Sequence, residues 1–545
     1  MDGNFLLDRE RAGNLNREGS NEFWLASLIG RIVRLVNGVN QYAFIVFLLL
    51  LFFFGFRLSP NEEGYLALAK QFYDPNWIQN SAILSEFAST RLIFQYIAGF
   101  LLSIFSFEAT AGVGRLLLCL LLAWPLAKLY RLFRLDNADI VLHLAFLYFG
   151  LQSFFAGEFI FLDFEPKGFA YVFVLFALYY GFAERYRSAA LYAVIASYFH
   201  LLVGGWFALY FIVYYLIWEK DYKRATGLGL AYMLAMIPLF IFLLPTLKGS
   251  ISPTDTPVSA DWIYCYFKMP FLIGLFASIP YFISAHLEGV LLFIAFFLIS
   301  ALPLRVYRNE LNKKVIALNT VIAAGLMLWL IVAYFDREGS FIKYFPFRIN
   351  ALFTFLVFLQ LVFLLKHFFS HPRRYPYLQV AVLIWFFIVP APKNIYRLFI
   401  EARLILSSSP NPAYEEMVSF VKNNTEREAV LLLLSQKSLL ADNTEFDIRS
   451  PEFAFFDMDL PIMRKTERER FVSYLFGPVS PNPEELYRWY VRIQEKAKVT
   501  KEPPYLCELR QKYRIDYLLA DFEVKDIPCL QLVYQNPQYY LYRIQ

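Results

Sequence analysis

The stretch "VNQYAFIVFLLLLFFFGF" (39–56) decides the fold class, because no charged residue interrupts it. As a helix it would extend about 27 Å at 1.5 Å per residue, close to the roughly 30 Å of a bilayer's hydrocarbon core. Similar runs recur along the 545-residue chain, which is 58% hydrophobic, 19% aromatic and only 18% charged. Soluble domains do not have this composition. We therefore expect a polytopic membrane protein.

Eleven apolar runs are candidate membrane spans. Some are shorter than the usual 20 residues, which snorkelling flanks or a locally thinned bilayer can accommodate. The predicted spans lie near 39–56, 112–130, 139–156, 168–183, 188–203, 204–218, 225–245, 287–304, 315–334, 350–366 and 377–391. Together they define a helical transmembrane domain over 39–392, with two larger outer loops at 57–111 and 157–167.

Basic residues gather in alternate loops, which predicts a cytoplasmic N-terminus. These inside residues are Lys128, Arg131, Arg134, Arg185, Arg187, Lys220, Lys223, Arg224, Arg305, Arg308, Lys313, Lys314, Lys366, Arg373 and Arg374. The pattern holds if 91–107 and 270–285 are interfacial or re-entrant segments rather than spans. The basic residues behind the net charge of +5 then indicate the orientation of the chain in the membrane, and we expect no nucleic-acid partner. Residues 1–38 are the expected amphipathic segment on the cytoplasmic face.

The composition changes after the last span, and 400–545 has the pattern of a small α/β domain. We expect helix, turn and strand in 411–434, a helix in 483–498, helix into strand in 507–522, and a closing hairpin in 530–544. Eleven crossings place this domain on the extracytoplasmic side of the bacterial inner membrane. Cys507 and Cys529 share the domain and form either a disulfide or two free thiols.

Two predicted spans, 188–203 and 204–218, share so few residues between basic clusters that they must form a short hairpin. Its turn falls in "HLLVGGW" (200–206). A hairpin that stops short of the outer surface leaves a hollow above it, so we expect His200, Gly204 and Gly205 at the floor of a cavity. The alternative role for His200 is that of a structural hydrogen-bonding residue.

Acidic residues collect in the first two outer loops. "NEEGYLALA" (61–69) begins an amphipathic helix, and Glu62 shares its face with Tyr65, so Glu62 is preferred over Glu63 as a catalytic acid. The second loop contributes Glu158, Asp163 and Glu165. Such carboxylates can take a proton from an acceptor hydroxyl or hold a divalent cation against a phosphate. The predicted ligands of that cation, Mg²⁺ or Mn²⁺, are Glu62, Asp163 and Glu165.

A phosphate-bearing lipid would need cations on the same face. Arg348 in "DREGSFIKYFPFRIN" (336–350) stands at the outer end of a late span, and Lys343 precedes it. Lys167 follows the second acidic loop and is a third expected phosphate contact. The alternatives are purely structural: Arg348 as an orientation anchor, and Glu62 with Glu63 as compensation of a helix dipole.

"NEEGYLALA" resembles the Asp-Glu-x-x-Tyr pattern of GT-C membrane glycosyltransferases. The second acidic loop, the late arginine and the C-terminal domain also resemble features of that superfamily. The resemblance implies transfer of a sugar from a polyprenyl-phosphate carrier to an envelope glycan, lipid or protein at the outer face. Asn61 stands where the family's leading Asp, often the base, would be. Either Glu62 or Glu63 has that role, or catalysis is lost. The alternative function is a non-catalytic lipid-carrier binder, transporter or assembly protein.

Overall fold

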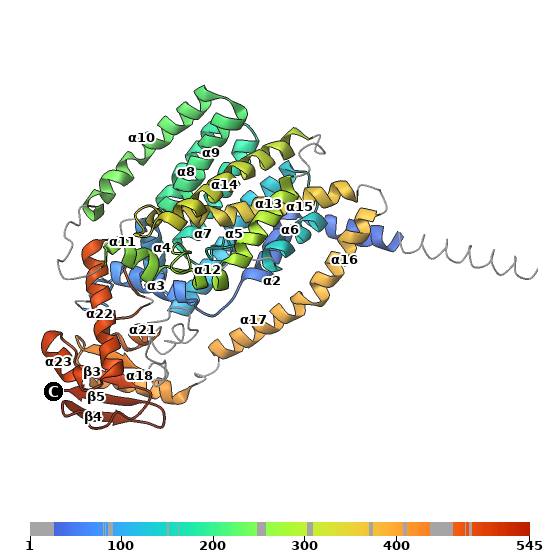
Figure 1. Cartoon of the computed structure of the whole chain (residues 1–545). Coiled ribbons are helices and arrows are strands. Elements are labelled where there is room, and N and C mark those ends of the chain that lie inside the picture. Colours follow the sequence, from blue (N-terminus) through green and yellow to red (C-terminus); the bar gives the residue numbers. More distant parts are fainter. Residues whose placement is uncertain are drawn as a thin grey trace, which may run out of the picture.

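The computed structural model describes residues 27–79, 81, 83–84, 91–149, 152–161, 163–247, 258–301, 309–369, 374–406, 411–435, 461–474, 476–478 and 482–545. These residues form a large helical part and a smaller C-terminal domain that holds a five-stranded sheet (Figure 1). The predicted combination of a helical region and a small C-terminal α/β domain is confirmed. Most of the expected N-terminal segment, residues 1–26, lies outside the described residues.

The helical part contains helices of very different length. In chain order they are α2 (Gln41–Phe53), α3 (Pro60–Tyr73), α4 (Leu92–Leu102), α5 (Phe107–Leu132), α6 (Asn137–Phe149), α7 (Pro166–Phe182), α8 (Tyr186–Phe199), α9 (Leu201–Tyr214), α10 (Tyr222–Leu247), α11 (Ala260–Trp262), α12 (Ile279–Ala285), α13 (Leu287–Ala301), α14 (Glu310–Phe335), α15 (Asn350–Phe368), α16 (Arg374–Ile388) and α17 (Pro390–Leu406). Short π-helical or 3₁₀ turns join several of them: η1 (Tyr215–Glu219), η2 (Ile263–Lys268), η4 (Ile342–Tyr344) and η5 (Pro346–Ile349).

Six helices among the described residues are long and apolar enough to cross a membrane, or eight if each of two bent helix pairs is one span. Several predicted spans are shorter, such as α6 with 13 residues and α8 with 14. The length and apolar composition of these helices indicate a membrane protein. The predicted count of eleven spans is not confirmed. One bent pair joins Ser27–Asn37 to Gln41–Phe53 at 93°, so the first helix lies across the direction of α2.

The helical part has two ends that matter for the site. At the N-terminus of α5, Glu108 contacts Arg464 of the C-terminal domain, and we call this the domain end. Helix α5 runs from there for 26 residues to Leu132, about 39 Å away along its axis. We call that opposite end the distal end. Because Lys366 at the C-terminus of α15 also lies at the distal end, Arg348 at the other end of α15 lies at the domain end.

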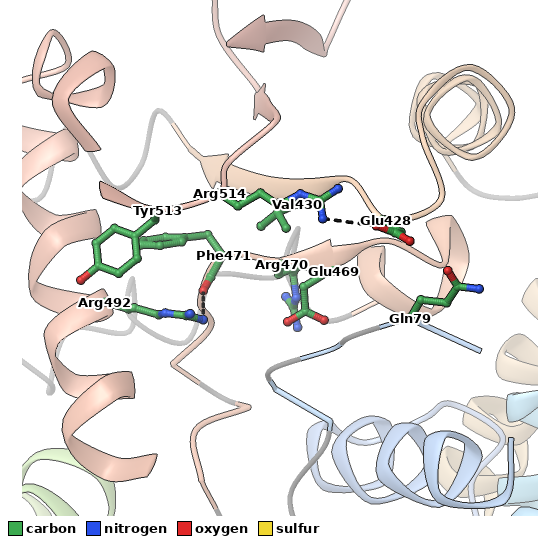
Figure 2. A pocket seen from close by; sticks show the side chains of 9 residues that line it. All are labelled: Gln79, Glu428, Val430, Glu469, Arg470, Phe471, Arg492, Tyr513 and Arg514. Atoms are coloured by element: carbon green, nitrogen blue, oxygen red, sulfur yellow. Dashed lines mark hydrogen bonds and ion pairs between the residues drawn. The ribbon is translucent and has the colours of Figure 1, made fainter. Parts of the chain in front are cut away.

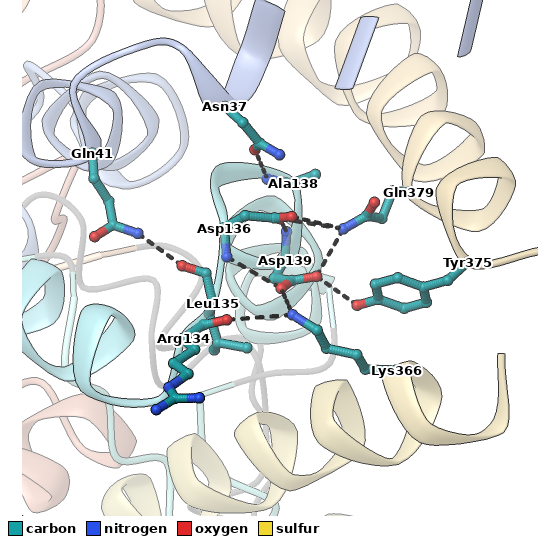
Figure 3. A network of polar contacts seen from close by, with 10 residues as sticks. All are labelled: Asn37, Gln41, Arg134, Leu135, Asp136, Ala138, Asp139, Lys366, Tyr375 and Gln379. Atoms are coloured by element: carbon teal, nitrogen blue, oxygen red, sulfur yellow. Dashed lines mark hydrogen bonds and ion pairs between the residues drawn. The ribbon is translucent and has the colours of Figure 1, made fainter. Parts of the chain in front are cut away.

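A buried polar network fastens the distal end (Figure 3). The carboxylate of Asp139, near the start of α6, is fully buried and accepts hydrogen bonds from Lys366 Nζ at 2.7 Å and Gln379 Nε2 at 2.8 Å. The Tyr375 hydroxyl donates a third bond at 2.5 Å. Asp136 and Asp139 also cap each other's backbone N–H groups, the reciprocal arrangement that starts a helix. The network therefore joins α6, α15 and α16.

Helices α8 and α9 form the hairpin expected from the sequence, but only its first arm is short, because α9 and η1 together make a helix of membrane-spanning length. They are joined at His200, whose Nδ1 accepts a hydrogen bond from the Val203 N–H at 3.4 Å and caps α9. Gly204 packs directly on the backbone of Ser197, where a Cβ atom would overlap it. The two arms have 14 residues each before the π-helical turn η1 extends the second.

The C-terminal domain is built on a mixed sheet with strand order β2-β1-β3-β5-β4. Its elements are α18 (Pro412–Asn424), β1 (Val430–Leu434), α21 (Ile462–Thr466), β2 (Glu469–Arg470), α22 (Pro483–Lys501), α23 (Tyr505–Lys512), β3 (Tyr517–Ala520), β4 (Leu530–Gln535) and β5 (Tyr540–Ile544). Strand β1 pairs in parallel with β2 and β3, while β5 pairs antiparallel with β3 and β4. Each predicted element appears here, and Cys507 and Cys529 form a disulfide.

Candidate functional site

The acidic helix α3 begins with a capping box, which explains where Glu62 points. Ser59 is the N-cap, Pro60 occupies the first turn, and Glu62 accepts a hydrogen bond from the Ser59 N–H at 3.0 Å. The fully buried Glu62 carboxylate also pairs with both Nε and NH2 of Arg115, the Nε contact being 2.7 Å. A further hydrogen bond comes from the Phe164 N–H at 2.7 Å. Both carboxylate oxygens are thus occupied by protein donors.

Glu63 faces the C-terminal domain. Arg464 of α21 donates to its carboxylate from Nε at 2.6 Å and reaches Glu108 from NH1 at 2.9 Å. Burial raises the pKa of Glu63, while Arg464 opposes that shift. The sequence alone gives this side chain no partner, because it does not reveal that the C-terminal domain covers this face of α3. Glu63 instead bridges the two parts of the molecule.

Four charged side chains meet at the domain end, and we call them the charged cluster: Glu158, Glu165, Lys167 and Arg348. Lys167 Nζ lies 3.1 Å from Glu165 Oε1 and 3.5 Å from Glu158 Oε2. Arg348 NH1 lies 3.2 Å from Glu158 Oε1. The side chains of both acids are 2% exposed and that of Arg348 is 11% exposed. Residues from the second acidic loop, α7 and η5 therefore come together at one site.

Local backbone structure positions the charged cluster. Glu165 is the N-cap of α7, and Pro166 places Lys167 in its first turn. Phe345 links η4 to η5 with φ 52°, an uncommon conformation for an aromatic residue, and its ring packs 4.5 Å from the Arg348 guanidinium. Burial raises the pKa of Glu165 to about 8, although Lys167 opposes the shift. The cluster thus contains a carboxyl group whose protonation changes near neutral pH.

Tyr65 and His200 border the charged cluster. Tyr65 extends from α3, and the charges of Glu165, Arg348 and Lys167 all act on its hydroxyl. Burial raises the Tyr65 pKa. The charges of Arg348 and Lys167 also act on His200 at the α8–α9 junction. Gly204 is buried and Gly205 half-buried in the next turn of α9. Residues of α3 and of the α8–α9 junction are therefore both close enough to the charged cluster for its charges to act on them.

Asp163 and Lys343 have other surroundings. Asp163 lies beside Glu62, and burial followed by the Glu62 charge raises its pKa. Lys343 Nζ lies 2.6 Å from Asp261 Oδ2 of α11. Within the described part of the chain, Lys343 forms no ion pair with a residue of the charged cluster. Lys343 therefore ties η4 to α11 rather than extending the phosphate-binding group expected from the sequence.

The predicted cation ligands do not form one donor set. Over the described ranges, no group of three or more His, Cys, Asp or Glu side chains is arranged to hold a metal ion. Glu62 is bound by the guanidinium of Arg115, and Glu165 is paired with Lys167. Dependence on Mg²⁺ or Mn²⁺ stays a prediction.

Arg115 is the partner of Glu62, and it was not among the residues singled out from the sequence. It donates to Glu62 and to the carbonyl oxygens of Gly55 and Arg57, so it connects α5, α3 and the end of α2. A signal was present in the sequence, since Arg115 lies inside the predicted span 112–130, far from the other charge of that span, Lys128, and ionisable residues inside spans tend to be functional or paired.

No protein-family model and no curated protein matches this chain. Its function therefore has to be argued from the geometry of the charged cluster and its neighbours.

Proposed function

We propose that this chain is a GT-C-like membrane glycosyltransferase that moves a sugar from a polyprenyl-phosphate carrier to an envelope acceptor at the extracytoplasmic face. The observation that carries the proposal is the charged cluster. Burying four ionisable side chains together costs desolvation energy that fully exposed positions avoid. A buried group of this kind at the end of apolar helices favours a function over a purely structural role.

Arg348 and Lys167 are the proposed contacts of the lipid phosphate. The buried Arg348 Nε makes no hydrogen bond with any described residue, so it is a donor that a phosphate oxygen could engage. Lys167 Nζ is held by two acids and packs 3.5 Å from the centre of the Phe159 ring. Two cations at this position would stabilise the negative charge that the phosphate acquires when the sugar leaves.

Glu165 is the proposed proton acceptor. During transfer the acceptor oxygen bonds to the anomeric carbon, the bond from that carbon to the phosphate oxygen breaks, and the phosphate leaves with the electron pair. Glu165 takes the proton of the acceptor hydroxyl. A carboxyl with a pKa of about 8 suits this role at neutral pH, whereas both oxygens of Glu62 are already bonded.

Two further observations support the proposed orientation. Lys128, Arg131 and Arg134 lie at the distal end, as expected for a cytoplasmic face. The Cys507–Cys529 disulfide is typical of proteins in oxidising compartments outside the cytoplasm. Both agree with a charged cluster and a C-terminal domain on the extracytoplasmic side.

The second candidate function is a non-catalytic binder of the same lipid carrier. Asn61, which replaces the family's usual acid, is exposed at the start of α3 and cannot accept a proton. Glu62 beside it serves the capping box and Arg115. These two observations favour binding without transfer, and the same charged cluster would provide the phosphate contacts.

The first test separates these functions. Purified protein in nanodiscs is given a labelled polyprenyl-phosphate hexose, with envelope extract as the source of acceptors. We expect label transfer, at least 100-fold reduced by Glu165→Gln, and donor binding at least 10-fold weakened by Arg348→Gln. Lys343→Gln is the matched control and should change neither. Donor binding without transfer by the unaltered protein would favour the non-catalytic binder, and donor binding insensitive to Arg348→Gln would refute the proposed site.

A further inference from the structure

A cavity of about 220 Å³ lies between the C-terminal domain and the segment that follows α3 (Figure 2). Its lining includes Gln79 of that segment, Glu469 and Arg470 of the edge strand β2, and Arg492 of α22. A smaller cavity of about 80 Å³ shares Phe471 and Arg492 with it. Neither cavity contains a residue of the charged cluster, so the proposed transfer does not account for them.

Some charges in the lining are already used within the protein. Arg514 pairs with Glu428 and with Asp516, at 3.3 Å in each case. Arg470 is fully buried, and its guanidinium lies 4.7 Å from the centre of the Phe476 ring. Arg514 is therefore already paired, whereas Arg470 packs on an aromatic ring and also acts on Glu469 through its charge.

Glu469 has an oxygen without a partner. The residue is 6% exposed, its Oε1 accepts a long hydrogen bond of 3.4 Å from the Ile83 N–H, and the Ser81 side chain also stabilises the carboxylate. Its Oε2 makes no hydrogen bond with any residue in the described part of the chain. A buried acceptor left in this state costs free energy, about 1–3 kcal/mol and more for a charged group. Burial accordingly raises the pKa of Glu469 to about 7.

Arg492 presents a guanidinium to the same cavity. It donates one hydrogen bond, from NH1 to the Phe471 carbonyl at 3.3 Å, and packs 5.6 Å and 5.8 Å from the ring centres of Phe471 and Tyr513. Among the described residues it forms no ion pair. Figure 2 shows Arg492 and Gln79 on opposite sides of the cavity, with Glu469 between them.

These groups select a ligand that both donates and accepts hydrogen bonds. A sugar hydroxyl does both, so neighbouring hydroxyls of one ring could donate to Glu469 and accept from Arg492. A phosphate or carboxylate ligand would lie next to the like charge of Glu469. Phe471 and Tyr513 also line the cavity and add apolar aromatic surface beside these polar groups.

We propose that this cavity binds one neutral sugar unit of a glycan, held mainly by Glu469, Arg492 and Gln79. At about 220 Å³ it is smaller than the roughly 300–1,000 Å³ of drug-sized sites, which suits a single ring with the rest of the glycan outside. The site goes beyond the proposed transfer and does not require it, because binding can be measured without donor or lipid.

The test uses the full chain in nanodiscs on an array of immobilised neutral hexoses, N-acetylhexosamines, deoxyhexoses and uronic acids, with inorganic phosphate as a competing anion. We expect saturable binding of at least one neutral sugar, at least 10-fold weakened by Arg492→Gln and by Glu469→Gln. Arg543→Gln is the matched control, because Arg543 lies in the same domain, is exposed and lines neither cavity. Gln79→Ala is a second variant, because Gln79 lies outside the helices and strands and is only half-buried.

Three outcomes would overturn the proposal. The first is binding of no neutral sugar, and the second is neutral-sugar binding that none of the three cavity variants weakens. The third is preferential binding of uronic acids or phosphate that Glu469→Gln strengthens, which would identify an anion site instead. A sugar bound with these sensitivities by a chain that transfers nothing would support this site and count only against the proposed transferase.

Discussion

Glu62 and Glu165 differ in what surrounds their carboxylates, and the roles we propose for them follow from that difference. Sequence alone favoured Glu62, because it begins an acidic helix and shares a face with Tyr65. The choice could not account for Arg115, which lies 53 residues further along the chain and occupies both Glu62 oxygens. The second acidic loop contributes two acids, Glu158 and Glu165, that the structure joins to Lys167 and Arg348, and its functional role stays a prediction.

Glu62→Gln should lower stability. The change leaves the Arg115 guanidinium buried without its anion, which typically costs about 3–5 kcal/mol. We expect a clear drop in the thermal unfolding midpoint of the detergent-purified protein, and the double variant Glu62→Gln, Arg115→Met should recover part of it. If Glu62→Gln has wild-type stability but abolishes transfer, the catalytic role predicted from the sequence motif returns to Glu62.

Glu165 should give the transfer reaction its pH dependence. Its folded-state pKa is raised to about 8 by burial, so its proton-accepting form grows as the pH rises toward 8. The same raised pKa means that its contribution to stability is present at acidic pH and declines as the pH rises from about 4.5 to 8. We expect the initial rate to rise between pH 6 and 8. A rate that is flat over this range would exclude Glu165 as the titrating base.

Among the elements, the hairpin of α8 and α9 shows how far a length argument reaches. Two basic clusters separated by few residues predicted two short arms joined near His200. The structure has the hairpin and a first arm of 14 residues, but the second arm continues through η1 to Glu219 and is 19 residues long. The sequence could not predict how close the arms are, because that distance depends on the packing of one glycine, Gly204, on Ser197.

The two adjacent glycines of this hairpin make a matched pair. A Cβ atom at Gly204 would overlap the backbone of Ser197, whereas one at Gly205 would meet only the Tyr232 hydroxyl at 3.6 Å. Gly204→Ala should therefore separate α8 from α9 and reduce the free energy of unfolding by an amount typical of overpacking, about 1–3 kcal/mol. The measurement is the thermal unfolding midpoint in detergent, which should fall. Gly205→Ala should be nearly neutral. Equal effects of the two substitutions would argue against the close helix crossing.

At the level of the whole molecule, composition predicted the fold class but not the number of spans. Helices such as α6 and α7 are apolar yet have only 13 and 17 residues. Composition shows that these segments are apolar but does not give the length of each helix, which also depends on neighbouring helices and on the polar loops at its ends. The C-terminal elements were easier to predict, since strands and helices of a small domain show clear periodicity. The contact of that domain with α3 through Glu63 and Arg464 has no local signature in the sequence.

Orientation is the property of the whole molecule on which the proposed function depends. The basic residues of the distal end and the disulfide of the C-terminal domain both predict that Gln545 lies outside the cytoplasm. Alkaline phosphatase fused after Gln545 should therefore be active, and a green fluorescent protein fused at the same point should stay dark. Fusions after Phe369, at the distal end beyond α15, are the matched control and should give the opposite signals.

A fluorescent, phosphatase-negative fusion at Gln545 would place the charged cluster on the cytoplasmic side, because Glu63 and Arg464 hold the C-terminal domain against the same end of the helices. An extracytoplasmic transferase would then be impossible for this chain.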